Sequence, residues 1–260
     1  MPEVSSHAAG SFCWVELATT DPQAAKKFYG GLFGWTPVDS PAGPDMVYTL
    51  LQINGKDVGA LYPLTPDMLS QGVPPNWGTY VSVSSADEAA KKAKSLGGNV
   101  LMEPFDVMEH GRMTIVQDPT GAAISLWQAR NHIGVRLIGE PNTFCWNELQ
   151  TNDTAKASDF YTKLFGWTAK TDEGPTQYTE WINNGSPIGG MMKMGDQMAG
   201  VPPHWLPYFM VADCNATADK AKSAGAKLYV PPTDIPKVGT FSVIADPQGA
   251  VFAIIKLTHQ

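Results

Sequence analysis

The feature that most constrains the fold of this chain is a tandem repeat. Residues 12–35 read FCWVELATTDPQAAKKFYGGLFGW, and residues 144–167, offset by 132 positions (144 − 12), read FCWNELQTNDTAKASDFYTKLFGW. The two segments share 14 of 24 residues. Such similarity within one chain indicates a structural unit that occurs twice.

The match continues in the same order further along the chain, at an offset of 128 (201 − 73). The matching pairs are Val73 to Trp77 with Val201 to Trp205, and Asp118 to Ala122 with Asp246 to Ala250. Between the two copies, residues 129–141 carry no clean periodicity and end in a Gly-Glu-Pro turn signal. We therefore predict two domains, residues 1–130 and 141–260, joined by a linker at 131–140.

Each copy has the pattern of a strand, a helix and three strands, and then repeats it. Residues 12–19 alternate as in a strand, and residues 22–33 have the apolar spacing of a helix that ends at Gly34. A capping sequence at 85–88 opens a second helix. Further strands are predicted near residues 36–39, 46–53, 57–62, 79–83, 99–102, 113–117 and 123–127, with a Pro-rich loop at 63–76. The predicted fold class is α+β, with four βαβββ segments.

The composition is that of a folded protein without a basic surface. Hydrophobic residues make up 43% of the chain and charged residues 17%, which is enough for a core in each half. The formal net charge is −7 and no Lys/Arg-rich run occurs, so nucleic acid and anionic membranes are not expected partners. No apolar run approaches the roughly 20 residues of a membrane span, and the N-terminus lacks a signal-peptide pattern. We expect a cytoplasmic protein.

The cysteines do not indicate a disulfide framework or a thiolate zinc site. Cys13, Cys145 and Cys214 are odd in number and form no CxxC pair. We expect them to be reduced and packed.

Paired βαβββ segments, a first helix that closes on FYxxLFGW and a DPxGA turn before the last strand together resemble the vicinal-oxygen-chelate superfamily. This group includes glyoxalase I, the bleomycin- and fosfomycin-resistance proteins and the extradiol dioxygenases. The chain is most similar to two-module bacterial glyoxalase-like proteins, from Phe12 to about Leu257. The resemblance implies two glyoxalase-like cupped mixed sheets. Whether each cup forms within one half or by exchange of segments stays open, as does a homodimer.

Metal-using members of the superfamily hold a divalent ion with side chains from the first, fourth, fifth and eighth strands of a cup. Counted from the motifs, these positions fall at Trp14, Ala60, Gly78 and Ser125 in the first copy, and at Trp146, Gly190, Leu206 and Ala253 in the second. None of them is the imidazole or carboxylate that a divalent metal needs. The five histidines lie in tails, loops and the linker. We therefore predict no metal and no other cofactor.

A glutamate follows the inward-facing tryptophan of each first strand. Glu16 lies two residues after Trp14, and Glu148 two residues after Trp146, so each shares the inner face of its cup. Burial raises the pKa of such a carboxylate, which makes it a candidate general base or an anchor for a ligand N–H. The alternative is that each glutamate accepts hydrogen bonds from its neighbours and only fixes the cup floor.

Tryptophans are the other candidates for ligand binding, because large flat side chains suit a flat or aromatic ligand. Trp14 and Trp146 are expected at the cup floors, where ordinary core packing is the alternative. Trp77 and Trp205 follow Pro-Pro sequences and are expected at a cup rim.

The two copies differ near the last hairpin, where only the first contains an imidazole and a guanidinium, His110 and Arg112. These side chains would suit an anionic ligand in the first cup. The second copy has a methionine-rich segment at 191–198, which fits either a flexible lid or a strand end with core methionines. Tyr48 and Tyr178 lie on third strands, and the sequence does not decide which face they occupy.

Two functions follow from these residues. The first is a protein that binds a small flat or apolar molecule in aromatic-lined cups without the usual metal, as resistance members of the superfamily do. The alternative is a lyase or isomerase resembling glyoxalase I, with Glu16 or Glu148 as the base. A metal-dependent dioxygenase conflicts most strongly with the missing ligands. Both favoured functions imply a small-molecule ligand.

Overall fold

A computed structural model describes residues 3–43, 46–174 and 177–258. The first half contains β1 (Phe12–Thr19), α1 (Pro22–Phe33), β2 (Thr36–Gly43), β3 (Met46–Ile53), β4 (Lys56–Pro63), α2 (Pro66–Ser70), β5 (Asn76–Ser82), α3 (Ala86–Ser95), β6 (Asn99–Val107), β7 (Gly111–Gln117) and β8 (Ala123–Ala129). The second half contains β9 (Phe144–Thr151), α4 (Thr154–Phe165), β10 (Thr168–Thr171), β11 (Thr179–Asn183), β12 (Ser186–Lys193), the 3-10 helix η1 (Asp196–Met198), β13 (His204–Met210), α5 (Cys214–Ser223), β14 (Lys227–Ile235), β15 (Gly239–Ala245) and β16 (Val251–Leu257).

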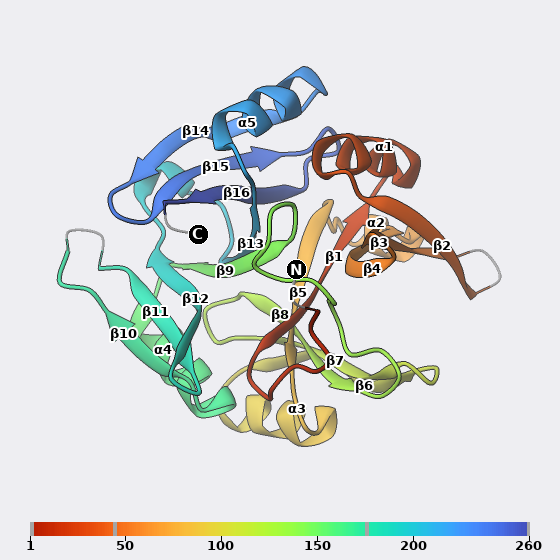
Figure 1. Ribbon diagram of the computed structural model, residues 1–260. Helices are drawn as coiled ribbons and strands as arrows, with labels where there is room; N and C mark the ends of the chain where they lie inside the picture. The colour runs from red at the N-terminus through yellow and green to blue at the C-terminus, as the bar shows by residue number, and fades with distance from the viewer. Residues whose placement is uncertain (1–2, 44–45, 175–176, 259–260) are drawn as a thin grey trace.

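The strands form two separate eight-stranded mixed sheets, one from each half (Figure 1). The strand order is β2-β3-β4-β1-β5-β8-β7-β6 in the first sheet and β10-β11-β12-β9-β13-β16-β15-β14 in the second. β1 pairs parallel with β4 and antiparallel with β5, and β9 has the same relation to β12 and β13. Each sheet is thus built from two βαβββ segments of one half. The predicted α+β fold is confirmed, and the chain does not exchange segments between its halves.

The first helix of each half follows from its local sequence. The Asp21 side chain caps α1 by accepting a hydrogen bond from the backbone of Ala24, and Gly34 ends the helix in the left-handed conformation. Asp153 and Gly166 have the same roles for α4. The buried face of α1 consists of Ala25, Phe28, Tyr29, Leu32 and Phe33. This apolar face holds the helix against the convex side of its sheet.

The convex sides of the two sheets meet in one shared core. A single cluster of buried side chains spans both halves, and the rings of Trp35 and Phe209 lie 5.3 Å apart between centroids. α1 lies beside α5, and α3 beside α4 (Figure 1). Two smaller apolar clusters, around Trp14 and around Tyr208, belong to one half each. These smaller clusters line the concave faces, which point away from the shared core.

Hydrogen bonds cross the shared core in both directions. The Trp77 indole donates to the Tyr29 hydroxyl (3.0 Å), and the Tyr29 hydroxyl donates to Asp246 of the other half (2.9 Å). The equivalent residues in the reverse direction are Trp205, Tyr161 and Asp118. The FYxxLFGW helix and the DPxGA turn recognised in the sequence therefore join one half to the other.

Two local predictions need correction. The loop predicted at 63–76 contains the short helix α2, because Thr65 caps it and Pro66 opens it. β5 begins at Asn76 rather than at Thr79, because Trp77 is drawn into the shared core and continues the strand. The three cysteines are free, as expected. Across the described ranges, no helix has the length and apolar character needed to cross a bilayer.

Candidate functional site

The concave face of the first sheet, which we call the first cup, is built from rows of side chains that lie across neighbouring strands. Residues paired between adjacent strands point to the same side of the sheet, so each row faces the cup together. The rows are Trp14-Tyr80-Ser125, Ala60-Glu16-Gly78 and Tyr62-Ala18-Asn76. Glu16 therefore lies at the centre of the floor, with only small residues beside it.

Three aromatic side chains surround the Glu16 carboxylate. The Tyr48 hydroxyl donates to Oε2 (2.6 Å), and the Tyr80 hydroxyl donates to Oε1 (2.5 Å). The Trp14 indole in turn donates to the Tyr48 oxygen (3.0 Å). Each carboxylate oxygen has a lone pair left for another donor, and Glu16 is only partly buried.

The first cup favours the protonated form of Glu16. Burial raises the pKa of the carboxyl, while the hydrogen bonds from Tyr48, Tyr80 and Trp14 lower it by a smaller amount. Burial also raises the pKa of both tyrosines, so the phenols remain donors. The centre of the cup thus presents a proton acceptor whose pKa lies above its usual range.

One wall of the first cup is apolar and exposed. Met102 and Phe105 on β6 pair with Ile115 and Met113 on β7, which belong to the apolar cluster around Trp14. Met102 is 37% exposed and Phe105 is 39% exposed. Exposed apolar side chains on a concave surface are typical of a ligand site rather than of a protein exterior.

The linker covers one end of the first cup. The His132 ring packs edge-on against Trp14 with 4.5 Å between centroids, and the Trp127 indole donates to the His132 carbonyl (2.9 Å). The Val135 backbone donates to the Cys13 carbonyl (2.8 Å), which fixes the linker on β1. Trp14 is therefore buried, as the packing alternative for this residue predicted.

The second cup has the same rows with different side chains. They are Trp146-Tyr208-Ala253, Gly190-Glu148-Leu206 and Met192-Gln150-His204. Trp146 is partly exposed, in contrast to its buried counterpart in the first cup. Met191 and Met194 are buried, which supports a strand end with core methionines over a lid, and Met192 is partly exposed.

Glu148 accepts hydrogen bonds from a different set of side chains than Glu16. The Gln150 side-chain amide donates to Oε1 (2.5 Å), and the Tyr208 hydroxyl donates to the same oxygen (3.1 Å). Tyr178 also bonds to the carboxylate and receives the Trp146 indole N–H (2.9 Å). Burial nevertheless raises the pKa of Glu148, against the lowering effect of these bonds.

Two differences between the copies explain why the second carboxylate is more enclosed. Leu206 occupies the position of Gly78, and Gln150 occupies the position of Ala18. Leu206 is 3% exposed and Gln150 is 7% exposed, and they flank Glu148, which is 5% exposed. The first cup is therefore the more open one at its carboxylate.

The positions counted for metal ligands do lie on the concave faces, but their side chains do not fit a divalent ion. In the first cup they are indole, methyl, hydrogen and hydroxymethyl groups, and the second offers no better donors. In the described parts of the chain, no group of three or more His, Cys, Asp or Glu side chains is placed to hold a metal. The floor of each cup instead has one carboxylate and two phenols.

The expected rim position of Trp77 and Trp205 is wrong. Both side chains are 5% exposed and belong to the shared core. Each lies three residues before a cup-facing tyrosine of its strand, Tyr80 or Tyr208. Because side chains alternate along a strand, an odd interval places the indole on the convex side. Neither indole reaches the interior of a cup.

Arg112 does not face the first cup. Its guanidinium donates to both oxygens of Asp87 (2.7 and 2.9 Å) on α3 and to Asp106 (3.1 Å). These carboxylates hold it on the helix side of β7. Arg112 is therefore not placed to bind an anionic ligand in the first cup, contrary to what the sequence had suggested. His110 is half-buried in the turn between β6 and β7, and His259 lies outside the described residues.

The sequence missed the tyrosines that complete both sites. Tyr80 and Tyr208 are the direct neighbours of the floor tryptophans, Trp14 and Trp146, on the next strand. Both tyrosines occupy the same place in the repeat, five residues after a Pro-Pro sequence. This shared position was a signal, but only the strand register shows that they meet the glutamates.

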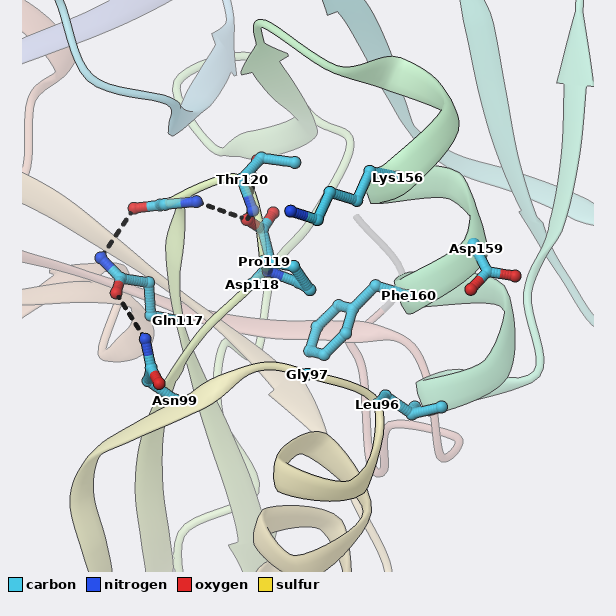
Figure 2. Close-up of a pocket in the computed structure, with 11 residues that line it drawn as sticks. Leu96, Gly97, Asn99, Gln117, Asp118, Pro119, Thr120, Lys156, Asp159 and Phe160 are labelled. Atoms are coloured by element: carbon cyan, nitrogen blue, oxygen red, sulfur yellow. Dashed lines mark hydrogen bonds between the residues drawn. The ribbon is translucent and has the colours of Figure 1, made fainter.

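A further cavity of about 560 Å³ lies outside the cups, where the two halves meet. Figure 2 shows Phe160 and Lys156 of α4 opposite the turn that contains Asp118 and Thr120. Thr120 and the turn backbone already donate to Asp118 Oδ1. These bonds lie within the turn and fix its shape beside α4.

The fold and the two cups agree with the comparisons to known proteins. The family described as the Glyoxalase/Bleomycin resistance protein/Dioxygenase superfamily matches residues 11–126 and 132–254. The chain belongs to this family, with one module in each half, and the resemblance seen in the sequence is confirmed.

Relatives of full length carry two kinds of name. A protein of Mycobacterium tuberculosis named "Putative glyoxylase CFP32" is 43% identical over 263 residues, which covers 100% of both chains. The anthracycline biosynthesis protein DnrV of Streptomyces peucetius is 34% identical over 265 residues, covering 96% of this chain and 94% of that protein.

Solved structures share the fold at low sequence identity. The Mn(II)-bound glyoxalase from Novosphingobium aromaticivorans has a TM-score of 0.68 and 16% identity, covering 95% of this chain and 82% of that one. The 2,3-dioxygenase LapB from Pseudomonas sp. KL28 has a TM-score of 0.62 and 12% identity, covering 96% and 93%. These likenesses support the architecture alone.

Proposed function

We propose that the chain binds a small, flat, largely apolar molecule in its first cup, and that the ligand donates a hydrogen bond to Glu16. No metal takes part in this binding. The observation that carries the proposal is a partly exposed carboxylate on an aromatic floor beside an exposed apolar wall. Ligand sites generally combine such an apolar surface with few polar groups that orient the ligand.

The space beside Glu16 supports a flat ligand. The neighbours of Glu16 in its row are Ala60 and Gly78, and a methyl group added at Gly78 would meet nothing closer than 3.8 Å. Met102 and Phe105 offer apolar contact from the wall. The name of the DnrV relative points to the same ligand class, because anthracyclines contain planar fused rings.

The test is a calorimetric titration of the chelator-treated protein with 2-aminoanthraquinone, a flat probe with one amino donor group. We expect binding that weakens about tenfold or more in Trp14→Ala, because the cup floor loses its packing and Tyr48 loses the indole N–H that holds it beside Glu16. Trp146→Ala is the matched control in the second cup. Anthraquinone, which lacks the donor, should bind several-fold more weakly than the amino probe.

The role of Glu16 has its own test. At a pH above the raised pKa of Glu16, where the group is ionised, the probe should bind several-fold more weakly to Glu16→Gln, because a neutral amide oxygen is a poorer acceptor than a carboxylate. If Glu16→Gln keeps the affinity for the probe while Trp14→Ala loses it, the ligand does not donate a hydrogen bond to Glu16. Stoichiometric bound metal by elemental analysis, with glutathione-dependent turnover of methylglyoxal, would overturn metal-free binding.

A second candidate function is a lyase or isomerase of the glyoxalase type that uses Glu16 as the base. The raised pKa of Glu16 and its two phenol donors favour it, since a general base works best with a pKa near the working pH. The name of the mycobacterial relative points the same way. In that case Glu16→Gln abolishes turnover of a hemithioacetal substrate, while Trp146→Ala retains it.

A further inference from the structure

We infer that the second cup contains a subsite at Gln150 for a neutral hydrogen-bond donor, an N–H or O–H group carried by an apolar ligand. The inference rests on the proposed function, because it assigns a ligand chemistry to the second cup. It also makes the two cups different in specificity rather than duplicates.

The central observation is an unpaired acceptor. Gln150 is 7% exposed and faces the cup from β9, and its Nε2 donates to Glu148 Oε1 (2.5 Å). When Glu148 is ionised its oxygens only accept, so in that state this contact fixes the amide orientation and places the Gln150 oxygen on the other side. That Oε1 atom is buried and has no hydrogen-bond partner in the described parts of the chain.

A buried carbonyl oxygen without a donor is unfavourable, and buried side-chain oxygens are nearly always paired. A ligand group that donates to Gln150 Oε1 therefore gains more than it would from a site already satisfied by protein groups. The Glu148 carboxylate beside it disfavours an anion. The subsite thus selects for a donor and against negative charge.

The neighbours of Gln150 in its row fit this chemistry. His204 Nδ1 lies 2.9 Å from the Pro202 carbonyl, which only accepts, so the proton is on Nδ1 and Nε2 is an acceptor. Burial lowers the pKa of His204, which favours the neutral ring. Met192, the other neighbour, is partly exposed, and its flexible side chain can move to admit a ligand to Gln150.

The first cup has no such subsite. At the three equivalent positions it contains Ala18, Tyr62 and Asn76, and the Asn76 amide donates to the Pro74 carbonyl. The change from alanine to glutamine thus adds the unpaired acceptor in the second cup only. A reciprocal pair of substitutions can therefore test the subsite in both directions.

The experiment uses ¹⁹F NMR of the full chain with 5-fluorotryptophan at its eight tryptophans. Trp14→Phe and Trp146→Phe assign the signals that report on the first and second cups. The probes are 2-naphthol, which has one O–H donor, and naphthalene, which has none. In the wild type we expect 2-naphthol to bind the second cup about tenfold more tightly than naphthalene, from the Trp146 signal.

Gln150→Met keeps the length of the side chain and removes the carbonyl. It should reduce the difference between the probes at Trp146 to less than twofold. Because this variant also removes a donor to Glu148, Ala18→Gln gives an independent test. At Trp14 it should increase the preference for 2-naphthol several-fold above the preference that Glu16 gives in the wild type. A gain of preference cannot result from misfolding.

Equal affinity of the two probes at Trp146 in the wild type, or a preference that survives Gln150→Met, would overturn the subsite. These outcomes differ from failure of the proposed function, in which the Trp14 signal responds to neither naphthalene nor 2-aminoanthraquinone. The two ideas can thus fail separately.

Discussion

Glu148 is a carboxyl group inside an apolar sheet face, and its pKa is raised above the ordinary 4.5 by burial. The folded chain therefore binds this proton more tightly than the unfolded chain. Its contribution to stability is complete below pH 4.5 and is lost as the pH rises through the raised pKa, by about 1.4 kcal/mol for each unit of the shift.

Glu148→Gln removes this titration with little change in shape. The free energy of unfolding of the variant, measured with urea from pH 4 to pH 8, should rise relative to the wild type as the pH increases. Glu103→Gln, at an exposed position, is the control. Parallel pH curves for the wild type and Glu148→Gln would show that Glu148 has no raised pKa.

The sequence predicted the residues of each cup floor on β1 and β9 but not their partners. Two-residue alternation was enough to place Glu16 with Trp14, because that relation lies within one strand. Tyr48 and Tyr80 come from strands 32 and 64 residues away, and their contact depends on strand order and register. Arg112 failed as a ligand group because the positions of Asp87 and Asp106 could not be known from spacing.

At the scale of elements, the linker is tied to β1 more tightly than a plain connection requires. Gly134 has φ of +113°, and a methyl group there would lie 2.1 Å from the Cys13 carbonyl oxygen. Gly134→Ala should lower the free energy of unfolding by about 2–3 kcal/mol, since it combines a strained backbone with a clash. Urea unfolding measures this loss.

Gly139 is the matched control within the same linker. Its φ is +72°, and a methyl group would meet nothing within 4 Å, so Gly139→Ala should cost only about 1 kcal/mol. If the two variants have equal free energies of unfolding, the close approach of the linker to β1 does not contribute to stability.

Most helices and strands could be predicted from local patterns, because caps, apolar spacing and glycine stops lie close together in the sequence. α1 occupies the predicted residues 22–33. The exception at β5 is instructive, since Pro-Pro before Trp77 suggested a loop. Burial of the indole against Tyr29 continued the strand instead, and that contact belongs to the tertiary structure.

At the scale of the whole molecule, the shared core predicts that the halves unfold together. Tyr29→Phe leaves Asp246 and the Trp77 indole without a partner across this core, and should cost about 2–4 kcal/mol. Near-ultraviolet circular dichroism and tryptophan fluorescence should still report one coincident urea transition, shifted to lower concentration. Tyr229→Phe, at a tyrosine that is 53% exposed, should be nearly neutral.

Two transitions, with only one of them moved by Tyr29→Phe, would contradict a shared core. That result would mean that each half is stable without the aromatic contacts of the other.

The division between a convex core and concave cups also affects how such a chain can evolve. The residues that bond the halves together are the same in both copies, as with Tyr29 and Tyr161, while some cup positions differ, as with Ala18 and Gln150. A mutation in a cup row leaves the packing between the halves intact, so one cup can drift towards a new ligand while the other keeps its own. Duplication followed by back-to-back packing thus separates the selection for folding from the selection for specificity.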